Sequence, residues 1–147
     1  MQARPIITAL MVLFIFSTTA GTLAEPRGWG VGVGVFDSDF GVHARKDFMF
    51  GEEQQFEAVL QGGVYNQNKW TGRFDADFHY IFRPASTFRL YPLIGIDWAL
   101  QNKSNRAGVN LGGGLMIDIN TETRLFAEGK YVAGDWDGYA FTIGLYF

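Results

Sequence analysis

Residues 70–82 read WTGRFDADFHYIF, and the even positions of this stretch differ in chemistry from the odd positions. The even positions are small or aromatic: Trp70, Gly72, Phe74, Ala76, Phe78, Tyr80 and Phe82. The odd positions are mostly polar or charged: Thr71, Arg73, Asp75, Asp77, His79 and Ile81. Because side chains alternate between the two faces of a β-strand, this pattern predicts a strand with one aromatic face and one charged face.

A strand of this kind suits two environments. A soluble sandwich buries the apolar face of its strands and wets the polar face. A transmembrane β-barrel does the reverse, since its apolar face meets lipid and its polar face lines the lumen.

The first 24 residues predict export of the chain. Residues 6–16 are nearly all apolar, Arg4 precedes them, and the small residues Thr22 and Ala24 suit a signal-peptidase site. The apolar run is shorter than the about 20 residues that a spanning helix needs. We therefore expect residues 1–24 to be a cleaved secretory signal peptide and residues 25–147 to form one domain. The chain has no cysteine, so we expect neither a lipoprotein anchor nor a disulfide.

The composition favours a barrel wall. The formal net charge of −3 makes nucleic acid an unexpected partner. Aromatic residues make up 16% of the chain, yet no stretch after the predicted signal peptide is long and apolar enough for a transmembrane helix. The hydrophobicity is instead spread in alternation, which is typical of transmembrane strands.

Alternating segments recur along the whole domain, separated by turn residues. Eight strands fit, at residues 28–36, 40–50, 55–65, 70–82, 87–100, 106–119, 123–133 and 138–147. An even number of strands lets the first and last pair antiparallel, and tilted spanning strands need roughly 9–11 residues. The predicted fold is all-β, an eight-stranded antiparallel up-and-down transmembrane β-barrel, with six, nine or ten strands as alternatives.

Outward aromatic residues fall near the predicted turns, where interfacial girdles would lie. The predicted girdle consists of Trp29, Trp70, Trp98, Tyr131, Tyr139 and Phe147. A two-layer soluble core would place aromatic residues in mid-strand as often as at strand ends, and Phe74, Phe78 and Phe141 do lie in mid-strand.

Five segments, in this order, resemble a known family. They are GWGVGVG (28–34), RLYPLIG (89–95), NLGGG (110–114), RLFAEGKY (124–131) and YAFTIGLYF (139–147). The chain resembles the outer-membrane β-barrel domain family, the small OmpA-like and opacity-protein-like barrels of Gram-negative bacteria. The resemblance implies a bacterial outer-membrane location and a terminal Phe147 that the barrel-assembly machinery reads. It implies no single activity, and the short loops here speak against adhesion or receptor roles.

The inward positions carry acids and bases in a narrow space. The predicted lumen ion network is Glu57, Arg73, Asp75, Asp77, His79, Arg89, Asp97, Glu128 and Lys130. Arg45 and Asp47 are also predicted to face inward. Because unpaired buried charges cost several kcal/mol each, we expect a hydrogen-bonded plug, with Arg73 and Asp97 as partners on adjacent strands. An ion path, a carboxylate catalyst or a metal site at Asp75, Asp77 and His79 is a weaker interpretation.

The sequence therefore predicts a small integral outer-membrane barrel with a lumen filled by side chains, whose role is either structural, in envelope integrity, or in surface interaction. We expect no enzymatic activity, no catalytic residues, no cofactor and no metal. The expected partners are outer-membrane lipid and lipopolysaccharide, together with the assembly machinery, and the expected state is a monomer.

Two other classes of function stay open. A lipid A deacylase-like hydrolase would need a serine, a base and an acid, for which Ser38, His43 and Asp39 are the only candidate group. A soluble lipocalin-like binder would have its polar side chains outside and its aromatic side chains inside the barrel. Its cavity would be lined by Phe74, Phe78, Phe88 and Trp98.

Overall fold

The computed structural model describes residues 25–147 except 52, 67–69 and 102–103. The predicted signal peptide, residues 1–24, lies outside the described residues. The strands are β1 (Glu25–Phe36), β2 (Asp39–Phe50), β3 (Phe56–Asn66), β4 (Trp70–Tyr80), β5 (Phe82–Ala85), β6 (Phe88–Gln101), β7 (Ser104–Asp118), β8 (Arg124–Gly134) and β9 (Gly138–Tyr146).

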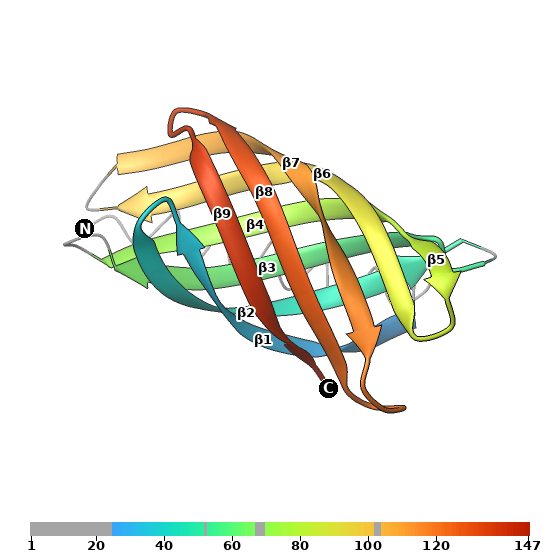
Figure 1. Cartoon of the computed structure of the whole chain (residues 1–147). Coiled ribbons are helices and arrows are strands. Elements are labelled where there is room, and N and C mark those ends of the chain that lie inside the picture. The colour runs from blue at the N-terminus through green and yellow to red at the C-terminus, as the bar shows by residue number, and fades with distance from the viewer. Residues whose placement is uncertain (1–24, 52, 67–69, 102–103) are drawn as a thin grey trace.

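The strands form one closed antiparallel sheet (Figure 1). Apart from β4 and β5, neighbours along the chain pair with one another, β1 pairs with β9, and the pairing of β4 with β6 completes the ring. Because β4 and β5 follow one another along the chain and both pair with β6, they count as one interrupted strand of the barrel. The barrel therefore has eight strands, as the sequence predicts. The described residues contain no helix long and apolar enough to cross a membrane.

The predicted strand 70–82 differs in one detail, because it is interrupted at Ile81 between β4 and β5. The Ile81 backbone N–H donates to the Gln55 carbonyl at 2.7 Å, outside the regular ladder. The two faces nevertheless continue across the interruption, since Ile81 is buried and Phe82 is exposed. Arg83, just beyond, donates to the carbonyls of Glu53 and Gln54 at 2.6 and 2.8 Å.

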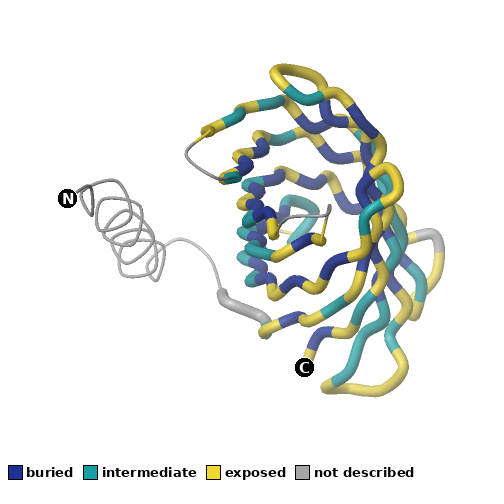
Figure 2. Tube along the Cα trace, turned by 90° about the vertical axis from the view of Figure 1, so that its left-hand side faces the viewer, coloured by how far each residue is buried: buried dark blue, intermediate teal, exposed yellow. Residues whose placement is uncertain are grey.

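Buried and exposed residues alternate along the strands (Figure 2). The apolar positions lie on the outside and the polar positions lie inside, as a transmembrane barrel requires. Phe74, Phe78 and Trp98 are 48%, 40% and 52% exposed, whereas Asp75 and Asp77 are buried. The lipocalin-like alternative requires the opposite facing and is therefore wrong.

The barrel has two distinct ends. We call the end where β1 begins and β9 finishes the terminal end, and the other, with the β1–β2 and β8–β9 connections, the hairpin end. At the terminal end, the backbones of Trp29 and Phe147 connect the first and last strands of the barrel through hydrogen bonds of 3.2 and 3.0 Å.

Apolar side chains fill the lumen near each end. The terminal cap consists of Met49, Ile81, Tyr91, Leu93, Met116, Phe126 and Tyr146. The hairpin cap consists of Phe36, Tyr65, Val132 and Ala140, with Trp136 packed against it. Most of the buried charged residues occupy the section between these two caps.

Candidate functional site: a charged lumen between two apolar caps

Arg45 links three strands at the centre of the lumen. Its two terminal nitrogens each lie 3.2 Å from an oxygen of Glu128, and its Nε donates to Gln61 Oε1 at 2.9 Å. The guanidinium also stacks over the Phe126 ring, 4.0 Å from its centroid. Because both Arg45 and Glu128 are shielded from solvent, this bidentate pair neutralises two charges that would otherwise be costly to bury.

Lys130 neutralises a second group of acids. Its Nζ lies 2.8 Å from Asp77 Oδ2 and 3.1 Å from Asp75 Oδ1. Asn110 Nδ2 donates to the remaining oxygen of Asp77 at 2.7 Å and to Asp75 at 3.1 Å. Asp75 Oδ2 accepts a further bond of 3.1 Å from Gln61 Nε2, so the oxygens of both carboxylates are bound by donors on β3, β7 and β8.

Arg73 and Asp97, which the sequence analysis pairs, are in contact. Arg73 Nε and Nη2 donate to Asp97 Oδ2 at 3.0 and 2.7 Å. The guanidinium lies 3.8 Å from the centroid of the Phe36 ring, so the pair lies directly under the hairpin cap. This position places an ion pair where the polar section meets the apolar one.

His79 lies at the other boundary, beside the terminal cap. Its Nδ1 is 3.2 Å from Glu57 Oε2, and its ring stacks on Tyr91 with centroids 4.3 Å apart. The Tyr91 hydroxyl donates to Glu128 Oε2 at 3.0 Å. Tyr91 thus connects the His79–Glu57 pair to the Arg45–Glu128 pair.

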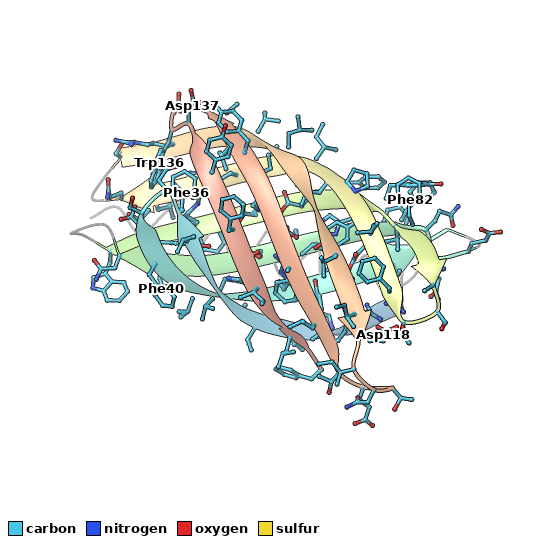
Figure 3. All side chains as sticks on the ribbon, in the orientation of Figure 1. Phe36, Phe40, Phe82, Asp118, Trp136 and Asp137 are labelled. Atoms are coloured by element: carbon cyan, nitrogen blue, oxygen red, sulfur yellow. The ribbon has the colours of Figure 1, made fainter. Side chains whose placement is uncertain are left out.

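Arg89 lies apart from this network, although the sequence groups it with the others. It pairs at 2.6 Å with Asp118, which also accepts a 2.6 Å bond from Arg124. These residues line an open depression of about 420 Å³ at the mouth of the terminal end. Figure 3 shows Asp118 at this end, beside the β7–β8 connection. The terminal cap separates Arg89 from the centre because Tyr91 and Leu93 lie deeper on the same strand.

The predicted girdle residues all lie on the outside of the barrel. Trp70, Trp98, Tyr131 and Tyr139 are exposed towards the hairpin end, and Trp29 and Phe147 are exposed at the terminal end. Figure 3 shows Phe40 and Phe82 pointing away from the wall at the two ends. The outer aromatic residues therefore form two groups, one towards each end.

Trp136 is a lumen residue that the sequence analysis does not single out. Its ring packs edge-on against Phe36, with centroids 4.9 Å apart, and Figure 3 shows the two side chains together at the hairpin end. The guanidinium of Arg73 lies 5.4 Å from the Trp136 ring. A bulky aromatic residue in a three-residue connection is the only signal in the sequence for this role.

The candidate group for a hydrolase does not assemble. His43 is buried in the lumen wall, whereas Ser38 is exposed in the β1–β2 turn. His43 lies four strand positions from Asp39, the first residue of β2, which corresponds to roughly 13 Å, and Ser38 lies beyond that strand end. Nor do Asp75, Asp77 and His79 converge, since the acids bind Lys130 and His79 binds Glu57.

Comparisons with known proteins agree with the fold. No family model matches the chain, and no curated protein matches it in sequence. Among solved structures, the N-terminal β-barrel domain of Pseudomonas aeruginosa OprF is similar at 15% identity and a TM-score of 0.69, covering 84% of this chain and 98% of that domain.

Two further barrels are similar in fold. Neisserial surface protein A shares 12% identity at a TM-score of 0.60, covering 83% of this chain and 97% of that one. Ail of Yersinia pestis shares 12% identity at a TM-score of 0.55, covering 81% and 92%. The predicted resemblance to small OmpA-like barrels is thus confirmed for the fold: this chain forms an eight-stranded barrel of the transmembrane type.

Proposed function

We propose that this protein is an integral outer-membrane barrel with a structural role in the cell envelope, and that it neither conducts ions freely nor catalyses a reaction. The observation that carries this proposal is the filled lumen, in which paired charges are enclosed between two apolar caps. An eight-stranded barrel is just wide enough for side chains to fill its interior.

The lumen caps argue against an open pore. An ion crossing the barrel would have to pass Phe36 and Trp136 at one end and Phe126 and Tyr146 at the other. It would also have to separate charge pairs that neutralise one another. The cost of breaking such a buried pair is typically about 3–5 kcal/mol, which disfavours steady conduction.

The outer wall argues for a membrane. Its strands expose apolar side chains in a continuous band, which is favourable against lipid and unfavourable against water. The similar barrel Ail of Yersinia pestis is an outer membrane protein that adopts its fold in a phospholipid bilayer nanodisc. We extend the same location to this chain, with lipid, lipopolysaccharide and the assembly machinery as its partners and a monomer as its state.

A single purification tests both parts of the proposal. Outer-membrane fractions washed with carbonate should retain the protein, and unboiled samples should migrate faster than boiled ones on a gel. The same protein in planar bilayers should show no steady conductance, with a general porin as the positive control. Recovery in the soluble periplasmic fraction would refute the location, and porin-like conductance would refute the closed lumen.

A further inference from the structure

The outward face of β2 carries one charged residue. Among the residues of β2 whose side chains face outward, Lys46 is the only Asp, Glu, Lys or Arg. Its neighbours on the same face of β2 are Ala44 and Phe48. A single cation in an apolar band needs a physical reason, because a lysine facing lipid is costly at the bilayer midplane and costs little near the interfaces.

The level of Lys46 on the wall points to an interface. It lies directly opposite Trp29 on β1, and the backbone of Trp29 bonds Phe147 at the terminal end. Both aromatic residues belong to the outer group at that end. The four-carbon stem of a lysine can also carry its ammonium from apolar surface towards headgroups.

The side chain has an aromatic neighbour and no acidic one. Lys46 Nζ lies 5.4 Å from the centroid of the Trp29 ring. Within the described part of the chain, this is the one polar or charged interaction of the Lys46 side chain, and the indole N–H of Trp29 has no hydrogen-bond acceptor there. Trp29 is 60% exposed, so an ammonium and an indole N–H are presented together at the lipid boundary.

We propose that Lys46 and Trp29 bind the phosphate group of a phospholipid in the leaflet at the terminal end of the barrel. The ammonium supplies the positive charge, the indole supplies a second donor, and the ring holds the lysine in place through a cation–π contact. Phosphate oxygens match these donors, and the acyl chains of the same lipid would lie against the apolar wall. The inference rests on the membrane location proposed above.

Native mass spectrometry of the folded chain in detergent micelles tests this site. Phosphatidylglycerol is added in steps, and the fraction of barrels that retain a lipid is measured. One basic residue near a lipid surface contributes about 1 kcal/mol, so Lys46→Met should weaken retention about fivefold. Lys46→Arg should keep it. Leu60→Met changes the residue paired with Lys46 on β3 and serves as the matched control, with retention unchanged.

Two further arms identify the ligand. Diacylglycerol with the same acyl chains lacks the phosphate and should be retained at least about fivefold less by the wild-type chain. Inorganic phosphate at millimolar concentration should not displace the lipid, and displacement would instead indicate a site for free anions. Equal retention by the wild type and Lys46→Met, or equal retention of both lipids by the wild type, would overturn the proposal. The comparison of the two lipids uses the wild-type chain alone, so it does not depend on whether a variant folds. If the lipid-binding proposal fails while the wild-type chain still fractionates with outer membranes, the proposed function stands.

Discussion

The two faces of the barrel wall place neighbouring residues of one strand in opposite surroundings. Arg45 and Lys46 are adjacent on β2, and both carry a positive charge. Arg45 lies in the lumen and is bound by Glu128 and Gln61, whereas Lys46 lies on the outside against Trp29. A charge inside the wall is thus stabilised by partners from other strands, while a charge outside depends on its distance from the interface.

The largest expected difference in stability is between variants that remove the lumen charge of Arg45 and variants that remove the outward charge of Lys46. Arg45→Leu leaves Glu128 buried without its bidentate partner, so we expect a loss of about 3–5 kcal/mol in unfolding free energy. Lys46→Leu should change the unfolding free energy by no more than about 1 kcal/mol, because Lys46 lies near the interface and has no buried partner. Guanidinium unfolding in lipid vesicles measures both. Similar losses for the two variants would contradict the difference between the faces.

A charge added to the outer wall should be costly in proportion to its depth. Leu111 is at the middle of β7 and 64% exposed, and Leu111→Arg should destabilise the barrel by about 2–4 kcal/mol. Ile119, outward and just past the terminal end of the same strand, is the matched site, and Ile119→Arg should cost about 0–1 kcal/mol. Equal costs at both sites would show that depth in a bilayer does not govern the outer face.

The pairing of lumen charges can be measured by a double-mutant cycle. Arg73→Met and Asp97→Asn should each destabilise the barrel, and the double variant should lose less than the sum of the two. We expect a coupling of about 1–3 kcal/mol, because each single change leaves a buried partner uncompensated. Strictly additive losses would mean that the contact of 2.7 Å contributes nothing to stability.

The smallest expected effect concerns the hairpin cap. Trp136→Ala removes the edge-on contact with Phe36 and should cost about 1 kcal/mol. Trp136→Phe should restore most of this loss because it keeps an aromatic edge in the same place. If Trp136→Ala is as stable as the wild type in the same unfolding assay, the connection does not close the lumen.

The sequence predicts which side chains face outward and which face the lumen, because side chains alternate along a strand with a period of two. The pattern of residues 70–82 correctly separates exposed Phe74 and Phe78 from buried Asp75 and Asp77. The interruption at Ile81 was not accessible, since alternation continues across it and only the backbone pairing with Gln55 departs from the ladder.

Ion pairs in the lumen could be predicted from the sequence only where the two residues lie on strands that pair directly. Arg73 and Asp97 lie on β4 and β6, which pair directly, so their distance from the connecting turn indicates contact. The partner of Arg45 depends on which strands meet when the barrel closes and on how far they are staggered. Arg89 was misplaced for the same reason, because facing inward does not indicate on which side of the terminal cap a residue lies.

The Arg45–Glu128 contact also constrains the order in which the barrel assembles. Arg45 is on β2 and Glu128 is on β8, 83 residues further along the chain, and the two strands come near one another only across the β1–β9 seam. In an open sheet, these two charges would lie near opposite edges, and neither could neutralise the other. A half-formed sheet entering lipid would therefore carry exposed, uncompensated charges, so joining the first strand to the last should accompany insertion and not follow it.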